Sequence, residues 1–280
     1  MSRLYETLRR MEQQRRSANP VQISPVQPLE LLSNVLAQPM DIEGAGTATI
    51  EAGAKSHLVA LSDPRGLGAE KFRALVTRLE SQRKTRDLKS VQITSAVSNE
   101  GKTLVSGNLA VTLAKHTGSR VLVIEGDLHR PALASLFGLG RREGIGQWWS
   151  AREDQERISR YLYRLNDLPL WFLGAGAMTD QPSHVLQSAR FAETFTRLAS
   201  LFDWVVVDSA PILAVVDANL WSRMVDGTLV VVREGVTPIR ALEQSLESLD
   251  NPKLAGMVLN EASEFDSTSY TDQYYGLNRS

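Results

Sequence analysis

The sequence has no cysteine and only four histidines in its 280 residues. Without cysteine, a disulfide framework, a cysteine-ligated zinc site and a thiol nucleophile are excluded. The histidines are scattered, which disfavours a histidine metal centre: His57, His116, His129 and His184. No run reaches the roughly 18 apolar residues of a membrane helix, and the first residues lack the apolar core of a secretory signal. We therefore expect a cytoplasmic protein.

The chain also lacks an excess of charge of either sign. It has 31 Lys and Arg against 32 Asp and Glu, a formal net charge of -1. Nothing in this balance indicates a nucleic acid or direct binding to an anionic membrane, and we expect neither. The average conceals two biased ends, because residues 1–16 carry five Arg and two Glu, whereas residues 261–280 carry four acids and one Arg.

The hydrophobic pattern divides the chain into four parts. Leu4, Leu8 and Met11 form an apolar stripe on a short helix, which either packs on its own domain or docks on a partner or membrane surface. A proline-rich stretch follows and is typical of a linker. The predicted parts are an N-terminal amphipathic helix (1–16), a linker (17–55), a globular domain (56–262) and a polar tail (263–280).

The globular part alternates short apolar runs with helical patterns. The predicted strands cover 91–95, 120–125, 170–173, 204–208, 228–233 and 254–260, and helical patterns include 68–83, 103–115 and 188–201. Strands that are apolar throughout and separated by helices indicate a sheet covered on both faces. We therefore predict an α/β fold with a doubly wound, mostly parallel sheet.

One loop has the residues of a phosphate-binding (Walker A) motif. Between a strand and a helix the chain reads A-V-S-N-E-G-K-T from Ala96 to Thr103, with alanine at the first position in place of the commoner glycine. Backbone N–H groups in such a loop bind phosphate oxygens, Lys102 neutralises the β- and γ-phosphates, and the Thr103 hydroxyl is a ligand of Mg²⁺. The sequence thus predicts a P-loop NTPase that binds ATP and Mg²⁺ through Ser98, Asn99, Glu100, Gly101, Lys102, Thr103 and Leu104.

Acidic residues end two further predicted strands. Glu125 and Asp127 lie in VLVIEGDLHRP, and Asp208 ends the apolar run of FDWVVVD. Ligands of open α/β sheets bind at the carboxyl ends of the strands, and three acids at one phosphate site would repel one another without a cation. We expect Asp127, Asp208 and Thr103 to hold Mg²⁺. The alternatives are a helix cap before Pro131 for the first pair and a strand-end turn for Asp208.

These motifs together resemble those of the bacterial tyrosine kinases (BY-kinases) of capsule and exopolysaccharide synthesis, within the ParA/MinD-like P-loop ATPases. EGDLHRP resembles their Walker A′ motif, and Asp208-Ser209-Ala210-Pro211 their Walker B ending. Residues 226–233 and 256–260 resemble two further family strands, and the likeness covers about residues 56–275. In related ATPases the asparagine matching Asn260 faces the adenine base.

The resemblance implies an ATP- and Mg²⁺-dependent protein tyrosine autokinase that regulates exopolysaccharide or capsule polymerisation and export. Lys102, Glu125, Asp127 and Asp208 would be its catalytic residues, with Glu125 or Asp127 orienting or deprotonating the tyrosine. The opening MSRLYETLRR resembles stand-alone members. Such members pair with a separate membrane activator, a polysaccharide co-polymerase, at the inner face of the membrane, and self-associate in a ring.

The tyrosines are concentrated where the resemblance places phosphate acceptors. Three of the six, Tyr270, Tyr274 and Tyr275, lie in the last 11 residues. Aromatic side chains gain no core packing in a disordered tail, so we interpret them as phospho-acceptors. The alternative is a tail that docks by its aromatic side chains.

Three departures from the family pattern leave other functions open. Glu125 replaces the first Asp of Walker A′, and Val76 replaces the last Arg of an E-x-x-R-x-x-R oligomerisation motif that begins at Glu70. The third departure is a tyrosine cluster that is short for the family. His129 also stands where Arg is usual, and we expect it to be a surface residue. The alternatives are a weakly catalytic ATP-binding regulator of the polysaccharide machinery and a ParA/MinD-like ATPase switch, although the extra lysine of the latter group is missing from the loop.

Overall fold

The computed structural model describes residue 42 and residues 44–50, 57–151, 157–165, 168–177, 181–249 and 253–262. The predicted N-terminal helix, most of the predicted linker and the tail with its three tyrosines lie outside the described residues. Predictions about these segments remain predictions. The described residues contain the whole phosphate loop and the three strand-end acids.

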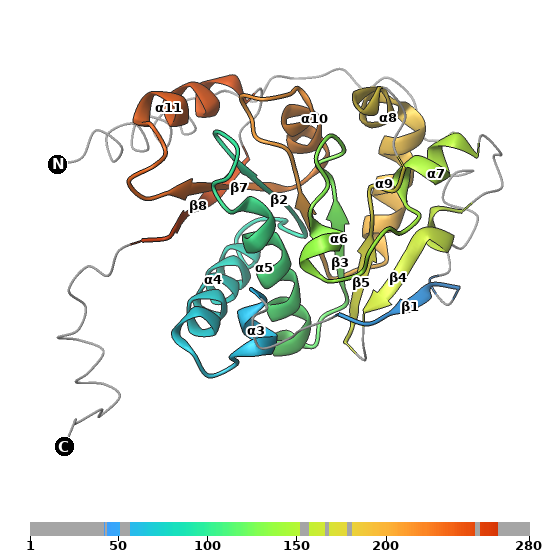
Figure 1. The fold of residues 1–280 in the computed structure, drawn as a ribbon, viewed down its shortest axis with the longest axis horizontal. Coiled ribbons are helices and arrows are strands. Elements are labelled where there is room, and N and C mark those ends of the chain that lie inside the picture. The colour runs from blue at the N-terminus through green and yellow to red at the C-terminus, as the bar shows by residue number, and fades with distance from the viewer. Residues whose placement is uncertain are drawn as a thin grey trace.

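One sheet of eight strands forms the centre of the described structure (Figure 1). The strands are β1 (Gly46–Ala48), β2 (Ser90–Ser95), β3 (Val121–Glu125), β4 (Leu162–Leu165), β5 (Leu170–Leu173), β6 (Trp204–Asp208), β7 (Gly227–Arg233) and β8 (Leu254–Asn260). Their order is β1-β4-β5-β3-β6-β2-β7-β8, and only the β4–β5 pair is antiparallel. The predicted mostly parallel α/β sheet is confirmed.

Helices cover both faces of the sheet, as predicted. On one face lie α3 (Val59–Ser62), α4 (Leu67–Arg83), α5 (Lys102–Thr117) and α6 (Leu133–Leu136). On the other lie α7 (Ile145–Ser150), a 3₁₀ turn (Ile158–Tyr161), α8 (Pro182–Gln187), α9 (Ala189–Ser200), α10 (Asp217–Met224) and α11 (Ile239–Ser248). In Figure 1, α4 and α5 lie side by side, and α8, α9 and α10 gather across the sheet from them.

Strand β3 shows why the central strands are apolar throughout. Val121 and Val123 pack in the core beneath α5, whereas Leu122 and Ile124 pack in the core beneath α9 and α10. Successive side chains of a strand point to opposite faces, so a strand between two helical layers must be apolar at every position. The same requirement places β2, β3 and β6 at the centre, and their carboxyl ends meet at one edge.

The stretch predicted to be a linker contributes a strand. Gly46–Ala48 pairs in parallel with β4, and Ile50 beyond it is buried. The folded part therefore begins before residue 56, ahead of the predicted boundary. Both β1 and β4 are short, and neither has a distinctive apolar run in the sequence.

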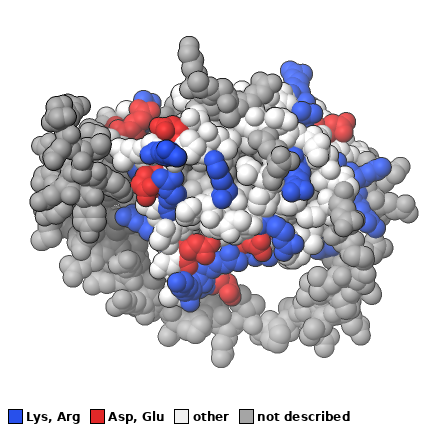
Figure 2. Space-filling view, turned by 90° about the horizontal axis from the view of Figure 1, so that it is seen from below, with Lys and Arg blue, Asp and Glu red and all other residues white. Residues whose placement is uncertain are grey.

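Charged side chains of both signs cover the lower side of the molecule in the orientation of Figure 1, as Figure 2 shows. One pair at the start of β3 and β6 is Arg120 with Asp203, whose Nε and Oδ2 atoms lie 3.5 Å apart. Nearby, burial lowers the pKa of the Lys89 amino group, and the Asp203 carboxylate opposes that shift. Positive and negative groups are thus interspersed on this side of the described structure.

Candidate nucleotide-binding site

The phosphate loop connects β2 to α5 through two residues in the left-handed region of backbone space. Asn99 has φ 66° and Gly101 has φ 92°. A Cβ atom at Gly101 would lie 2.1 Å from Nδ2 of Asn260, so both the conformation and the space require glycine. Helix α5 begins directly afterwards at Lys102, which turns its first N–H groups toward the loop.

A cavity of about 1100 Å³ opens beside this loop. Most predicted nucleotide-binding residues line it: Ser98, Asn99, Gly101, Lys102, Thr103, Leu104 and Asp127. Glu100 and Asn260 are not among its lining residues. The phosphate loop and the Walker A′ motif therefore share one cavity, whereas two of the predicted contacts do not line it.

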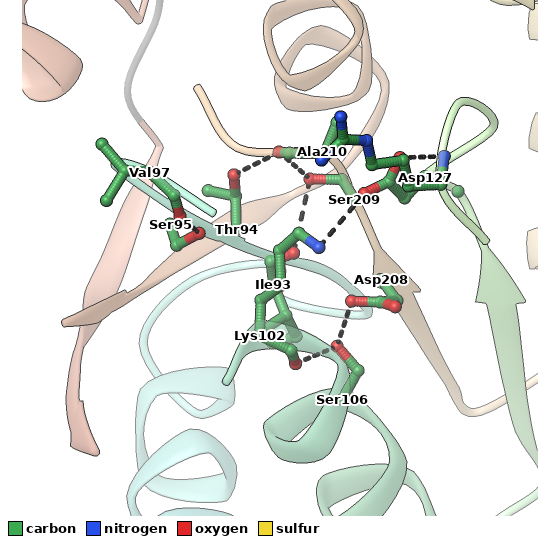
Figure 3. A network of polar contacts seen from close by, with 12 residues as sticks. Ile93, Thr94, Ser95, Val97, Lys102, Ser106, Asp127, Asp208, Ser209 and Ala210 are labelled. Atoms are coloured by element: carbon green, nitrogen blue, oxygen red, sulfur yellow. Dashed lines mark hydrogen bonds and ion pairs between the residues drawn. The ribbon is translucent and has the colours of Figure 1, made fainter. Parts of the chain in front are cut away.

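Lys102 and Asp127 form an ion pair in the wall of this cavity (Figure 3). Nζ of Lys102 lies 3.1 Å from Oδ2 of Asp127, and both side chains are largely buried. The other carboxylate oxygen, Oδ1, accepts the backbone N–H of Arg130 at 3.0 Å. Asp127 is thus fixed by the turn that follows it and faces the lysine that P-loop proteins use to bind phosphates.

Asp208 lies at the end of β6, completely buried, with one oxygen engaged and one free. Oδ1 accepts the hydroxyl of Ser106 at 3.1 Å (Figure 3), and the buried Oδ2 has no hydrogen-bond partner among the described residues. Burial raises the pKa of this carboxyl group to about 7, although Lys102 and the Thr103 hydroxyl act in the opposite direction. An unpartnered buried carboxylate oxygen beside a hydroxyl suits a hard divalent cation such as Mg²⁺.

Glu125 is turned away from this site. Its Oε1 accepts the N–H of Ala134 at the start of α6 (2.9 Å), and its Oε2 accepts the N–H of Ala175 after β5 (3.0 Å). It is buried and lines a second cavity, of about 810 Å³, together with Arg141 and Arg142. Within the described ranges no three His, Asp or Glu side chains are grouped to hold one metal ion. Glu125 therefore does not join Asp127 at the phosphate loop, and the expected Mg²⁺ ligands Thr103, Asp127 and Asp208 stay a prediction.

Gly126 lies between Glu125 and Asp127 and explains why their side chains face different cavities. Its N–H donates to the carbonyl of Asp208 at 2.7 Å, and its own carbonyl accepts the indole N–H of Trp221 at 3.0 Å. A Cβ atom here would lie 2.7 Å from Val207 and 2.9 Å from Trp221. The backbone at this glycine is pressed against α10 and tied to β6, so the residue after it leaves the sheet toward the phosphate loop.

His129 is exposed, as expected, and it also lines the nucleotide cavity. Its Nε2 lies 3.2 Å from Oδ2 of Asp217, a fully buried carboxylate that also accepts the hydroxyl of Ser183 at 2.5 Å. Further lining residues that the prediction missed are Arg130, Pro211, Ala214 and Val215. Each follows a predicted acid by a few positions, and that proximity was the available signal.

Val76, the departure in the oligomerisation motif, is a core residue. It is buried with Leu79 against α5, whereas Glu70 and Arg73 lie on the outer side of α4 and pair with each other. Arg73 also donates to the carbonyl of Pro64 at 2.9 Å. The position where the family motif has its last arginine therefore faces inward in this chain.

The fold and the site together define a P-loop nucleotide-binding protein. Residues 91–276 match the family model for the CobQ/CobB/MinD/ParA nucleotide binding domain (CbiA). Within the part of the chain that the structure covers, we find no helix with both the length and the apolar character needed to cross a bilayer.

Comparison with similar proteins places the chain in a narrower group within this family. The tyrosine-protein kinase YwqD of Bacillus subtilis (strain 168) is 30% identical over 222 residues, which are 79% of this chain and 91% of that protein. The succinoglycan biosynthesis transport protein ExoP of Rhizobium meliloti (strain 1021) is 30% identical over 223 residues, 76% of this chain but 27% of that protein. The kinase domain of Escherichia coli tyrosine kinase ETK has the same fold, with a TM-score of 0.63 at 24% identity over 86% of this chain and 98% of that domain. The chain belongs to the bacterial tyrosine kinases within the CobQ/CobB/MinD/ParA family.

Proposed function

We propose that this chain is an ATP- and Mg²⁺-dependent protein tyrosine kinase that phosphorylates tyrosines in the tail of a second copy of itself. The observation that carries the proposal is the Lys102–Asp127 pair, which puts a phosphate-binding lysine 3.1 Å from a carboxylate in one cavity with the phosphate loop. The names of YwqD and of the ETK kinase domain support the acceptor class.

Transfer to tyrosine needs positioning and charge neutralisation more than covalent help from the protein. The phenol oxygen forms a bond to the γ-phosphorus, the bond from that phosphorus to the bridging oxygen of ADP breaks, and the phenol proton passes to Asp127. Lys102 and the loop N–H groups hold the phosphates. Thr103, Asp127 and Asp208 would hold Mg²⁺, which supplies additional positive charge at the phosphates.

Asp127 is a better acceptor for the phenol proton than Glu125. Asp127 lines the nucleotide cavity beside the phosphate loop, whereas Glu125 lines a different cavity. A general base must lie within hydrogen-bond reach of the proton that it takes. We therefore assign proton transfer to Asp127 and a positioning role to Glu125.

The proposed acceptors are Tyr270, Tyr274 and Tyr275, which lie outside the described residues. Their segment is acidic before modification, with four acids and one Arg in residues 261–280. Each phosphotyrosine adds about -1.5 to -2 charge. Three would add roughly -5, so that the tails of neighbouring copies would repel one another and self-association would weaken.

The physiological role that we propose is control of exopolysaccharide or capsule polymerisation and export. ExoP bears the name of a transport protein of polysaccharide biosynthesis, and this chain spans about a quarter of it. We propose that a separate membrane protein, a polysaccharide co-polymerase, activates this chain and recruits it to the inner face of the membrane. The chain would then reach the membrane only through that partner.

The test is incubation of the purified protein with γ-labelled ATP and Mg²⁺, with and without membranes that contain the co-polymerase. Lys102→Met should abolish labelling, and the triple change of Tyr270, Tyr274 and Tyr275 to Phe should remove it from the chain. Tyr163→Phe, in β4, is the matched control and should stay labelled. Label retained on the triple variant would refute the tail as acceptor.

The position of Glu125 favours one second candidate, a weakly catalytic ATP-binding regulator. Because its carboxylate is taken up by backbone N–H groups, the site has one catalytic acid fewer than the motif suggests. Bound ATP with neither label nor released phosphate would favour this candidate. Release of phosphate without label would favour a ParA/MinD-like ATPase.

A further inference from the structure

Glu100 is a buried carboxylate within the phosphate loop that has no place in the mechanism above. It is 1% exposed and does not line the nucleotide cavity. Its Oε2 accepts the N–H of Val97 at 3.1 Å, and its Oε1 accepts the hydroxyl of Thr237. A negative charge behind a phosphate site opposes phosphate binding, so its presence calls for a compensating role. The two bonds supply one, because they fix the shape of the loop.

Asn260 holds the same part of the loop from the end of β8. Its Nδ2 donates to the carbonyl of Glu100 at 3.0 Å and occupies the space that a Cβ atom on Gly101 would need. Asn260 is not among the residues lining the nucleotide cavity. The family resemblance implied that this side chain faces adenine, whereas here its amide nitrogen binds the backbone of the phosphate loop.

Thr237 and Asn260 are parts of one connected structure. Arg233 and Asn260 are paired as the last residues of β7 and β8. The Thr237 hydroxyl oxygen accepts the N–H of Arg233 at 2.9 Å, and the N–H of Glu234 donates to the carbonyl of Asn260 at 3.1 Å. Both contacts with the loop therefore come from the adjoining ends of two neighbouring strands.

We propose that Thr237 and Asn260, here called the β7–β8 clasp, hold the phosphate loop in its nucleotide-binding shape and couple it to the carboxyl ends of β7 and β8. A shift of these strand ends would act on the Glu100 side chain through Thr237 and on the Glu100–Gly101 peptide through Asn260. Nucleotide binding and the order of these strand ends would therefore change together.

The first test is the affinity of the full chain for a fluorescent ADP analogue with Mg²⁺. Thr237→Val removes the hydroxyl at nearly constant volume, and Asn260→Ala removes the amide. Each should raise the Kd about tenfold, because Thr237→Val removes a donor to the Glu100 carboxylate and Asn260→Ala removes a donor to the Glu100 carbonyl. Thr237→Ser restores the hydroxyl and should restore the Kd. Thr196→Val, an exposed threonine on α9, is the matched control and should bind as wild type.

The second test follows the coupling in reverse by hydrogen exchange. Bound nucleotide should slow exchange of the backbone N–H of Glu234 and of residues 258–262 in the wild type, and should have less effect in Asn260→Ala. Wild-type Kd in both Thr237→Val and Asn260→Ala, or exchange that nucleotide leaves unchanged, would overturn the proposal.

These measurements rest on one part of the proposed function, nucleotide binding. They need no phosphoryl transfer. A clasp effect on Kd in a chain that never labels tyrosine would leave the clasp standing and overturn the kinase proposal. Tyrosine labelling by the wild type, together with wild-type Kd and exchange in the clasp variants, would overturn the clasp and leave the kinase proposal standing. A melting temperature of Thr237→Val that stays well above the assay temperature, with recovery of the Kd in Thr237→Ser, would show that the hydroxyl, and not a folding failure, accounts for the Kd.

Discussion

Glu125 and Asp127 stand two positions apart in one motif, yet the fold gives them to different cavities. Asp127 faces Lys102 beside the phosphate loop. Glu125 accepts backbone N–H groups from the segments that follow β5 and open α6. The difference arises at Gly126, where the chain is pressed against Trp221 and leaves the sheet. Spacing alone places two acids near one another, but the N–H donors within reach decide what each carboxylate does.

The largest effect expected from this comparison is on catalysis at Asp127. Asp127→Asn keeps the shape of the side chain but removes the proposed proton acceptor, so the rate of tyrosine labelling should fall by about 10²- to 10⁴-fold. Nucleotide affinity in the absence of Mg²⁺ should change much less, because the loop N–H groups and Lys102 remain. Initial rates of labelling at saturating ATP, together with the Kd for nucleotide, measure the two separately.

Glu125→Gln is the matched variant for that experiment. It keeps one acceptor oxygen, and it changes a side chain that does not line the nucleotide cavity. We expect the rate to fall by about tenfold or less, through a shift in the neighbouring loop. Equal losses in Asp127→Asn and Glu125→Gln would contradict the division of roles between the two acids.

The next largest effect is a loss of stability when Glu125 is replaced. Glu125→Ala leaves the half-buried N–H group of Ala134 and the buried N–H group of Ala175 without their acceptor, at about 1–3 kcal/mol for the buried group and less for the other. The free energy of unfolding from urea denaturation should therefore fall by about 2–4 kcal/mol. Glu247→Ala, an exposed glutamate on α11, should leave it within about 0.5 kcal/mol.

Glu125→Asp sharpens the same point, because it restores the residue that the family motif usually has. The shorter side chain reaches one of the two N–H groups but not both, so we expect a loss of stability about half that of Glu125→Ala. A gain in labelling rate with no loss of stability would show that the carboxylate belongs to the nucleotide site after all.

Much of the fold was predictable because the strongest signals in the sequence come from its most buried strands. The six predicted strands are present, with ends that differ by at most one residue. The strands at 46–48 and 162–165 were missed because each is short: the first pairs with the second, and the second lies between it and β5. Such short strands are set by tertiary contacts that a local pattern does not record.

Part of the site was also predictable from the sequence. Lys102, Thr103 and Asp127 gather in one cavity, and Asp208 lies buried at the end of the adjoining β6, because a parallel sheet brings the carboxyl ends of its strands together. The sequence could not show where Glu125 and Asn260 direct their side chains. Their partners are backbone groups of Ala134, Ala175 and Glu100, and backbone groups are the same in every sequence.

The smallest effect that we expect concerns Ser106, whose hydroxyl binds Asp208, a proposed Mg²⁺ ligand. Its hydroxyl lies 3.1 Å from Oδ1 of Asp208 and 2.8 Å from the carbonyl of Lys102, so one proton serves two acceptors. Ser106→Ala removes a shared hydrogen bond, worth about 0.5–1.5 kcal/mol. The Mg²⁺ concentration that half-saturates nucleotide binding should therefore rise about two- to tenfold, measured by titration with Mg²⁺ at fixed nucleotide. Ser222→Ala, a serine equally buried on α10 whose hydroxyl binds a helix carbonyl, should leave it unchanged. A hundredfold rise would mean that Ser106 itself binds the cation, and no rise would mean that Asp208 is held by its strand alone.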